Sequence, residues 1–432
     1  MYKDLVIIGA GAAGMIAAAQ AAELAAEFNL PLRITLLEKL PRPGKKLLAT
    51  GNGRCNIANA GAARAHYYNA AGQNPAFVQP ALQKFTQKNN LAFFRCRGLL
   101  TKEEERGKMY PLGDQAVAVL DCLRLHLAAL SRPGLQLNLL AEAEALALRP
   151  RPQGGFALKL AGGKAEVVAD ALILAMGGLA SPQLSSSRGF AGLLQPLGLQ
   201  PTRLYPALTQ VKIASPLPKA LQGVKFNGSA ALWQGEECLG EAEGEILFAA
   251  YGLSGPPILQ LSRLVSRNFY EQAQPRPQTF RLDLLPAMTA EDLLAELKAR
   301  RALPLDLENF LTGILNKRLG QQLIKLLGGR SLALPAAGLT DADLQRLARL
   351  IKGLPLPVSG VMGWERAQVM AGGLSLKDFD SRTLAARRWP GLFAAGELLD
   401  VCGDCGGYNL SWAWSSGRLA AQSAVEYLRS LL

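Results

Sequence analysis

Gly9, Gly11 and Gly14 are spaced to bind a phosphate group. They form the pattern G-x-G-x-x-G between the apolar run 5–8 and the Ala-rich stretch 15–28. In such a strand, turn and helix, the first glycine permits a tight turn and the second lets the backbone approach a pyrophosphate. The third lets helix and strand pack closely. The free N–H groups and the dipole at the helix start attract the phosphates. This pattern predicts a dinucleotide site.

Glu38 supplies the second part of this predicted site. The apolar run 34–37 ends in this acid, and an acid at that place accepts hydrogen bonds from an adenosine ribose. The alternative for residues 5–26 is a signal peptide or a membrane helix. Asp4 and the interrupting glycines argue against it. No other stretch is long and apolar enough to span a bilayer, so we expect a cytoplasmic protein without a membrane partner.

The other reactive residue types argue against several classes of protein. The chain has 6 cysteines, scattered except for Cys402 and Cys405, and they do not resemble a disulfide framework. With only His66 and His126 present and no second cysteine pair, we expect no metal site. A Ser-His-Asp hydrolase is poorly supported, because the segment 252–255 is not a G-x-S-x-G turn.

The net charge of +13 raises the question of a nucleic-acid partner. The excess is spread along the chain, and its one modest concentration, residues 95–108, also contains the acidic run 103–105. This spread favours a solvated surface, so we do not expect nucleic acid as the partner. An anionic substrate or an RNA partner stays open as an alternative.

A second strand-and-acid pattern near the C-terminus indicates which dinucleotide fits. Residues 392–397 form an apolar run that ends in Gly-Glu, and a glycine-rich stretch precedes a helical pattern over 410–428. A plain NAD dehydrogenase does not need this second strand, whereas an FAD site does. Glu397 would accept ribityl hydroxyls. The amides at Gly406, Gly407 and the helix start would face the flavin N1–C2=O edge, where negative charge grows on reduction.

Two further segments are expected to complete the FAD site. The loop 43–56 directly follows the second strand, and its glycines and cations suit pyrophosphate and isoalloxazine, although an ordinary basic loop stays an alternative. The strand 171–174 ends in a turn that passes close to the cofactor. The predicted cofactor contacts are Gly9, Ala10, Gly11, Ala13, Gly14, Glu38, Lys39, Lys45, Lys46, Gly53, Arg54, Cys55, Asn56, Ala145, Ala175, Gly177, Gly178, Gly396, Glu397, Gly406, Gly407, Tyr408, Asn409 and Leu410.

These motifs together resemble the BaiN-like flavoproteins, also described as the aminoacetone oxidase family of NAD(P)/FAD-dependent oxidoreductases. The resemblance extends over nearly the whole chain, and the matching motifs are 9–14, 44–59, 107–111, 244–256 and 396–417. The chain departs from the family pattern at 185–189. The resemblance implies an α/β fold in which a Rossmann-type FAD-binding domain carries an inserted β-barrel domain and a small helical domain.

The periodicity of the middle of the chain supports such an insert independently. Residues 201–285 alternate apolar and polar in short runs, and residues 286–352 switch to helical spacing. Thr289 with Asp292, and Thr340 with Asp343, are typical of helix starts. The expected parts are 1–190 and 356–432 for the FAD-binding domain, 191–285 for the β-barrel-like insert, 286–330 for the helical insert and 331–355 for the return of the insert.

The absence of a second G-x-G-x-x-G suggests how a nicotinamide would be used. It would dock directly on the flavin and leave before the substrate enters. We therefore expect an FAD-dependent oxidoreductase that passes reducing equivalents between NAD(P)H and a small organic substrate, such as a carbonyl compound, an enone or an amine. The predicted catalytic residues are Arg54, Cys55, Tyr110 and Tyr408, with Asn56 and Trp412 on the same reacting face.

Two other functions stay open at this point. One is a flavin-dependent tRNA-modifying enzyme, and the other is a non-enzymatic flavin redox sensor. Cys402 and Cys405 bear on the second, because a redox pair near a helix start would have a lowered pKa and exchange electrons with the flavin. Buried structural thiols are the interpretation we favour for this pair.

Overall fold

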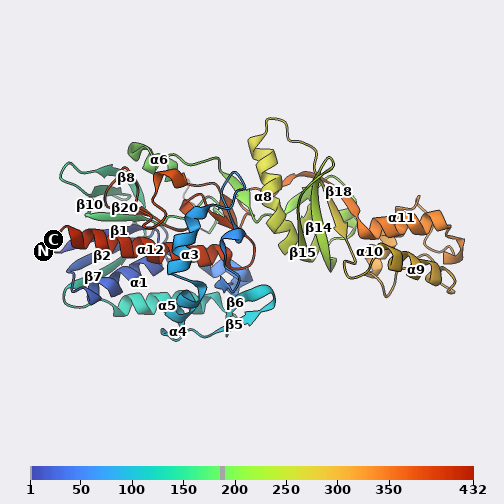
Figure 1. Cartoon of the computed structure of the whole chain (residues 1–432), viewed down its shortest axis with the longest axis horizontal. Coiled ribbons are helices and arrows are strands. Elements are labelled where there is room, and N and C mark those ends of the chain that lie inside the picture. The colour runs from blue at the N-terminus through green and yellow to red at the C-terminus, as the bar shows by residue number, and fades with distance from the viewer. Residues whose placement is uncertain (1, 185–189) are drawn as a thin grey trace. The chain divides into compact units, whose positions relative to one another are not determined.

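A computed structural model describes residues 2–184 and 190–432 (Figure 1). The departure from the family pattern at 185–189 lies outside these residues. The chain divides into two compact units. The first combines Met1–Pro206 with Gln368–Leu432, and the second is Ala207–Ala367.

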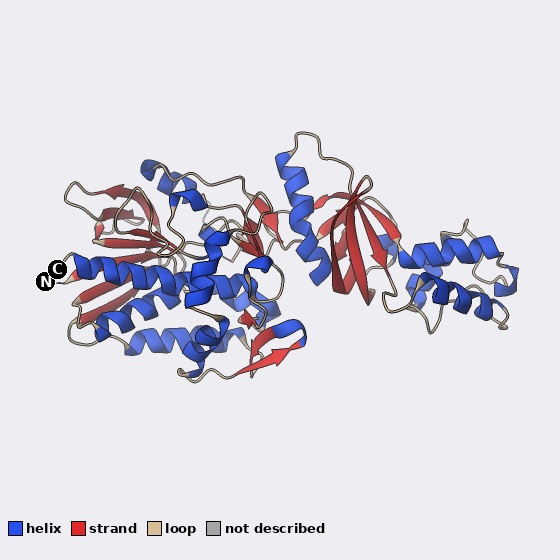
Figure 2. Cartoon of the chain, in the orientation of Figure 1, coloured by secondary structure: helices blue, strands red, loops and turns tan. Residues whose placement is uncertain are grey.

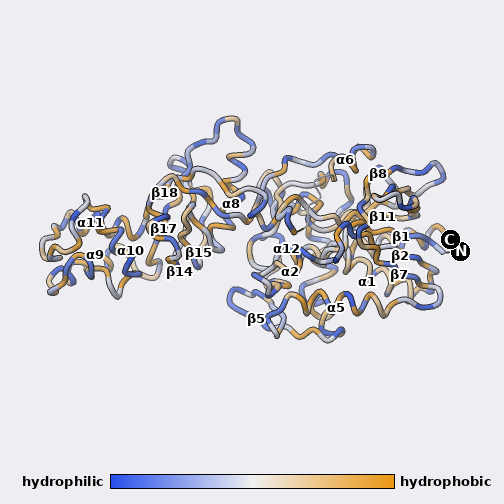
Figure 3. Tube along the Cα trace, turned by 180° about the vertical axis from the view of Figure 1, so that it is seen from behind, coloured by the Kyte–Doolittle hydropathy of each residue, from blue (hydrophilic) through white to orange (hydrophobic). Residues whose placement is uncertain are grey.

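A parallel sheet of five strands forms the centre of the first unit, in the order β20-β11-β1-β2-β7. These strands are β1 (Lys3–Ile8), β2 (Leu32–Leu37), β7 (Leu135–Leu140), β11 (Ala171–Leu174) and β20 (Leu392–Ala394). A parallel sheet is covered on both faces, so its central strands read as continuous apolar runs. Figure 3 shows the hydrophobic colours concentrated around these strands.

Two long helices pack closely in this unit. α1 (Ala12–Glu27) contacts α12 (Tyr408–Ser430), so the two ends of the chain meet. The Ala-rich face of α1 permits the close approach. A Cβ added at Gly417 of α12 would lie 2.5 Å from the carbonyl oxygen of Ala13, so the contact needs a glycine there. The C-terminal helix thereby reaches the N-terminal glycine turn.

The remaining elements of this unit surround the sheet. The helices are α2 (Lys45–Ala49), α3 (Gln79–Lys84), α4 (Gln87–Arg95), α5 (Ala116–Ala129) and α6 (Phe190–Leu194). The short strands are β3 (Ala58–Asn59), β4 (Tyr67–Tyr68), β5 (Thr101–Glu104), β6 (Lys108–Pro111), β8 (Ala145–Pro150), β9 (Phe156–Leu160), β10 (Val167–Ala169), β12 (Tyr205–Ala207), β19 (Val369–Ala371) and β21 (Cys402–Gly403). Of these, β3-β6-β5, β10-β9-β8 and β21-β4 form three small antiparallel sheets.

The second unit is a closed antiparallel barrel with helices added to it (Figure 2). The strand order is β13-β16-β15-β14-β17-β18. The strands are β13 (Val211–Ile213), β14 (Lys225–Gln234), β15 (Glu237–Ala249), β16 (Gly252–Ser254), β17 (Thr279–Asp283) and β18 (Leu354–Val361). The helices are α7 (Leu217–Ala220), α8 (Pro256–Glu271), α9 (Ala290–Arg301), α10 (Lys317–Lys325) and α11 (Asp341–Lys352).

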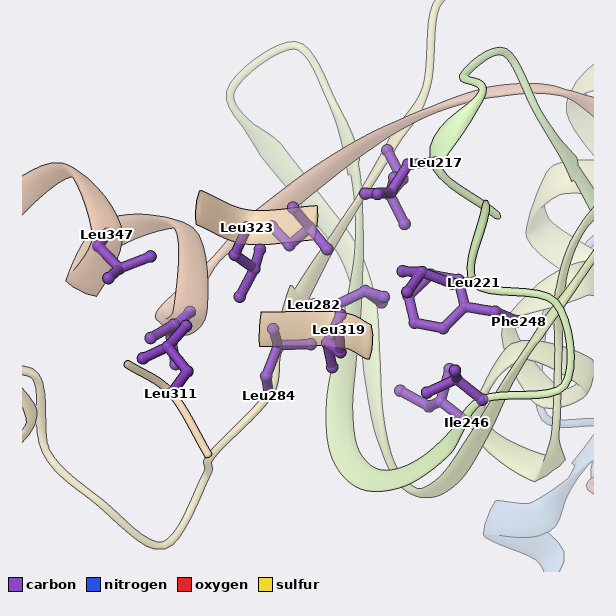
Figure 4. Close-up of a cluster of buried hydrophobic side chains, with 14 of the residues drawn as sticks. Leu217, Leu221, Ile246, Phe248, Leu282, Leu284, Leu311, Leu319, Leu323 and Leu347 are labelled. Carbon is purple, nitrogen blue, oxygen red and sulfur yellow. The ribbon is translucent and has the colours of Figure 1, made fainter. Parts of the chain in front are cut away.

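The barrel and its helices share one apolar core. Figure 4 shows Ile246 and Phe248 of the barrel in the same cluster as Leu319 and Leu323 of α10 and Leu347 of α11. The two helix starts expected from Thr-x-x-Asp patterns are confirmed, since α9 and α11 begin directly after a threonine that accepts from the Asp amide three residues on.

The predicted fold class is confirmed, with a Rossmann-type parallel sheet and an antiparallel barrel inserted in it. β18 pairs with both β13 and β17 and so completes the barrel after the helices. This strand spans the boundary expected at 355/356. Among the helices of the described part of the chain, none combines the length and apolar character that a membrane crossing requires.

Candidate cofactor pocket and active site

A pocket lies at the carboxyl ends of β1 and β2, the edge at which open parallel sheets bind ligands. Residues of the glycine turn, the end of β2, α2 and the start of α12 line it, and all belong to the first unit. Segments from both ends of the chain therefore form one continuous site.

The glycine turn leaves room for a phosphate. Gly9 has φ +102°, and a Cβ there would lie 2.5 Å from the Ala175 oxygen, while one at Gly14 would lie 1.8 Å from the Gly9 oxygen. A Cβ at Gly11 would meet nothing within 4 Å. Gly11 is also the N-cap of α1 and makes no side-chain cap. The pocket side of this turn is therefore open space in front of a helix N-terminus, which suits an anionic pyrophosphate.

Glu38 is fixed at the pocket wall by two backbone amides. Its Oε2 accepts from the Ala10 N–H at 3.2 Å and its Oε1 from the Leu40 N–H at 2.9 Å. Burial raises the pKa of this carboxyl, and the two hydrogen bonds act in the opposite direction. A carboxylate offers about four acceptor positions. The remaining ones are available to ribose hydroxyls, so the group fits the adenosine end of FAD.

Lys46 and Glu397 form an ion pair that lies on the pocket wall. The Nζ of Lys46 in α2 lies 2.7 Å from Oε2 of Glu397, in the 3-10 turn Gly396–Leu398. The other oxygen, Oε1, accepts from the Met370 N–H at 2.7 Å. A Cβ at Gly178 would lie 3.1 Å from the same Oε1. Glu397 thus holds an ammonium group in the pocket, a role beyond the ribityl contact expected from the sequence.

The start of α12 offers a second helix N-terminus near the pocket. Its N-cap, Gly407, has φ +97° and no side-chain cap, and a Cβ there would lie 2.7 Å from Oδ1 of Asn56. That Oδ1 is buried and has no hydrogen-bond partner among the described residues. Asn409 and Leu410 of the same helix line the pocket. An uncapped helix start beside an unpaired buried oxygen fits a polar ring edge such as that of flavin.

Arg54 and Tyr110 belong to a cluster beside the pocket and do not line it. The guanidinium donates to Asp114 at 2.6 Å and to Glu104, and it lies 4.1 Å from the centre of the Tyr110 ring. The two carboxylates raise the pKa of Arg54. Because both hold the same guanidinium, Arg54 is occupied by protein partners in this structure.

Cys55 is a fully buried thiol in a strained backbone conformation. Its exposure is 0% and its φ is +60°. Burial raises the pKa of the thiol to about 12, although the Thr50 side chain acts in the opposite direction. The group is therefore a protonated thiol at neutral pH, unlike a thiolate nucleophile.

Tyr408 contacts a histidine that the sequence did not indicate as functional. The Tyr408 and His66 rings stack at 4.4 Å, and Nδ1 of His66 lies 3.0 Å from Oδ2 of the buried Asp404. Positions 66 and 404 lie 338 residues apart. No motif spans such a separation, so only the fold could reveal this pair.

Cys402 and Cys405 are not joined by a disulfide in the structure. Burial raises the pKa of Cys405, with Lys108 acting against the shift and Asp404 with it. A redox pair would need the opposite shift. Among the described residues, no group of three or more His, Cys, Asp or Glu side chains is arranged to hold a metal ion.

The structure divides the predicted contacts into two groups. Those that line the pocket are Gly9, Gly11, Ala13, Glu38, Lys39, Lys45, Lys46, Ala145, Ala175, Gly177, Gly396, Glu397, Asn409, Leu410 and Trp412. Those that lie outside its lining are Ala10, Gly14, Gly53, Arg54, Cys55, Asn56, Gly178, Gly406, Gly407 and Tyr408. Lining residues that the sequence reasoning missed include Phe190, Leu193, Gln368, Val369 and Val401, which carry no recognisable motif.

Comparisons with known proteins agree with this fold. The model of the HI0933-like protein Rossmann domain matches residues 3–423. A 3-dehydro-bile acid delta(4,6)-reductase of Clostridium scindens is 36% identical over 97% of this chain and 98% of its own. Ribosomal RNA dihydrouridine synthases of Escherichia coli and Haemophilus influenzae are 31% and 27% identical, each over 98% of both chains.

The fold and the pocket define a Rossmann-type flavin-dependent oxidoreductase with an inserted barrel. Within that class, the chain belongs to the HI0933-like family. The resemblance to BaiN-like flavoproteins drawn from the sequence is thereby confirmed.

Proposed function

We propose that this enzyme reduces a carbon–carbon double bond conjugated to a carbonyl group, with FAD in the pocket and NAD(P)H as the electron donor. Two relatives of different substrate class support this reaction. One is a delta(4,6)-reductase of a 3-dehydro bile acid, and the other is a ribosomal RNA dihydrouridine synthase. A 3-oxo steroid diene and the C5=C6 bond of uracil are both double bonds polarised by a conjugated carbonyl. Reduction of a carbon–carbon double bond conjugated to a carbonyl is therefore compatible with the names of both relatives.

The observation that carries the proposal is the arrangement of the two helix starts in one site. The α1 start with Gly11 and the carboxylate of Glu38 suits the adenosine diphosphate half of FAD. The uncapped α12 start and Asn56 suit the ring. When bound, FAD supplies hydride chemistry. The dipole of α12 stabilises negative charge at its N-terminus, and Glu397 holds the Lys46 ammonium at the pocket wall.

The electron donor is proposed to use the same ring face as the substrate. The sequence has no second G-x-G-x-x-G that would bind a nicotinamide nucleotide apart from the flavin. Direct docking then requires the oxidised nucleotide to leave before the substrate enters. This predicts ping-pong kinetics.

A uridine of ribosomal RNA is the second candidate substrate. It is supported by the 31% identity to the Escherichia coli synthase over 98% of both chains. The conjugated small molecule is placed first because the bile-acid reductase is 36% identical over almost the same length.

Two half-reactions under anaerobic conditions test the proposal. NADH or NADPH should bleach the absorbance band of the oxidised flavin, and a 3-oxo-Δ4,6 bile acid added afterwards should restore that band. Mass spectrometry should then find a bile-acid product whose mass is greater by two hydrogen atoms. Unmodified ribosomal RNA in the second step tests the other candidate. If neither acceptor reoxidises the flavin under conditions in which NAD(P)H reduces it, the proposed reaction is wrong.

A further inference from the structure

Resting on the proposed function, we propose that His66 is the catalytic residue that delivers the proton in the reduction of the conjugated double bond. Asp404 is the residue that positions its imidazole. Among the described residues, this is a carboxylate–histidine pair beside the α12 start and the pocket that the sequence did not indicate.

The imidazole is held on one edge and free on the other. Its Nδ1 lies 3.0 Å from Oδ2 of Asp404, whose side chain is only 6% exposed. Within the described part of the chain, Nε2 makes no hydrogen bond. The side chain of His66 is 40% exposed, so a substrate atom can approach that nitrogen. When both ring nitrogens carry a proton, the Nδ1–H donates to Asp404 and the Nε2–H lies on the edge of the ring away from that carboxylate.

The backbone around this pair is fixed on both sides. β4 and β21 pair Tyr67 with Gly403, and the Asp404 N–H donates to the His66 oxygen at 2.9 Å. The hydroxyl of Tyr67 donates to the Tyr408 oxygen at 3.0 Å. The geometry of the pair is therefore set by a small sheet and by the first turn of α12, which is what pre-organisation of a catalytic group requires.

The pair lies outside the pocket lining, and Tyr408 connects it to the start of α12, where the ring is proposed to bind. The His66 ring stacks on Tyr408 at 4.4 Å with planes 23° apart. Tyr408 is the first residue of α12, and the next two residues, Asn409 and Leu410, line the pocket. The proton donor thus stacks on a residue that adjoins the pocket wall.

The proposed step balances atoms and electrons. Bound FAD would supply a hydride to the carbon β to the carbonyl, and the double-bond electron pair would move to the α carbon and the carbonyl oxygen. The imidazolium of His66 breaks its Nε2–H bond and gives that proton to the α carbon. The imidazole becomes neutral while Nδ1 stays held by Asp404, and it takes a proton from water before the next turnover.

Other candidate donors beside the pocket fit this step less well. Burial raises the pKa of the phenols of Tyr110 and Tyr408, which makes both weaker acids. Burial also raises the pKa of Cys55 to about 12, and that thiol has no exposed surface. The Tyr110 ring is further covered by the Arg54 guanidinium at 4.1 Å.

The test separates the two half-reactions in the full-length, FAD-loaded protein. His66→Gln keeps a polar group of similar size but has no acidic N–H. Reduction of the flavin by NAD(P)H should be unchanged, while reoxidation by the 3-oxo-Δ4,6 bile acid, or by ribosomal RNA, should slow by about a hundredfold or more. Added imidazole should restore part of the rate in His66→Ala. Asp404→Asn should lower kcat while KM and flavin reduction stay near the wild-type values.

Arg64→Gln is the matched control. Arg64 lies in the same 3-10 turn, Arg64–His66, and donates to the Asn74 oxygen, so this change disturbs the turn without removing the acid. Reoxidation at the wild-type rate should persist. If His66→Gln reoxidises as fast as wild type, or imidazole has no effect on His66→Ala, His66 is not the donor and the proposed function still stands. If wild-type protein reduces neither acceptor, the proposed function and this inference both fail.

Discussion

Replacing Glu397 by glutamine should weaken FAD binding while leaving the fold intact. The carboxylate accepts from Lys46 Nζ and from the Met370 N–H, both at 2.7 Å, and its side chain is 19% exposed. The amide side chain of the variant would keep an oxygen for the Met370 N–H but would lose the charge that holds Lys46. A ribityl hydroxyl that donates to this carboxylate would form a hydrogen bond to a charged group, which contributes about 1.5–3 kcal/mol. Since about 1.4 kcal/mol is tenfold in Kd, the loss of FAD affinity should be about tenfold to a hundredfold.

The assay is titration of apoprotein with FAD, followed by calorimetry or by flavin fluorescence. Glu245→Gln is the matched control, because Glu245 also pairs with a lysine, Lys225 at 3.1 Å, but on the barrel with side chains 52% and 56% exposed. An exposed pair contributes about 0–1 kcal/mol, and neither residue belongs to the pocket lining, so FAD affinity should not change. FAD binding by Glu397→Gln as tight as by wild type would refute this role of Glu397.

Three further outcomes follow from single features of the structure. Gly11→Val should abolish FAD binding yet leave folded apoprotein, because a Cβ there meets no protein atom within 4 Å and instead fills the phosphate space; flavin content equal to wild type would contradict the site. Burial raises the pKa of Asp400 from 3.8 to about 6. Its neutral form is favoured in the folded state, so its stabilising contribution is present below pH 3.8 and is lost as pH rises through about 6. Between pH 4 and 6, the free energy of unfolding of the wild type, measured in urea, should fall by up to about 3 kcal/mol because of Asp400. Asp400→Asn should lack this fall, and an equal dependence of the unfolding free energy on pH in both proteins would argue against it. Dithionite titration should consume two electrons in wild type and in Cys402→Ser with Cys405→Ser alike, because buried thiols with a raised pKa do not form a flavin-linked pair; a wild-type count of four would overturn this and favour a redox sensor.

The parts of the site that follow from sequence are those fixed by local geometry. The glycine turn could be predicted because the approach of Gly14 to the Gly9 oxygen, 1.8 Å from a notional Cβ, permits no other residue. Glu38 follows one strand later at a spacing set by the βαβ unit. The barrel was predictable only as alternation and, through family resemblance, as an insert.

The parts that sequence could not give depend on contacts between distant segments. Glu397 pairs with Lys46 across 351 positions, and His66 meets Asp404 across 338. Neither separation leaves a periodic signal, since both depend on how α12 and β21 return to the N-terminal sheet. Sequence also placed Arg54 on the reacting face, whereas the structure shows its guanidinium held by Glu104 and Asp114.

Mass spectrometry of the cofactor released from purified protein identifies the molecule that occupies the pocket. The pocket combines the glycine turn before α1, the carboxylate of Glu38 and the start of α12, and we expect a flavin that carries adenosine to use all three. The account predicts FAD in the released material, with about one molecule per chain after reconstitution. Release of FMN, or no flavin bound after incubation with FAD, would contradict it.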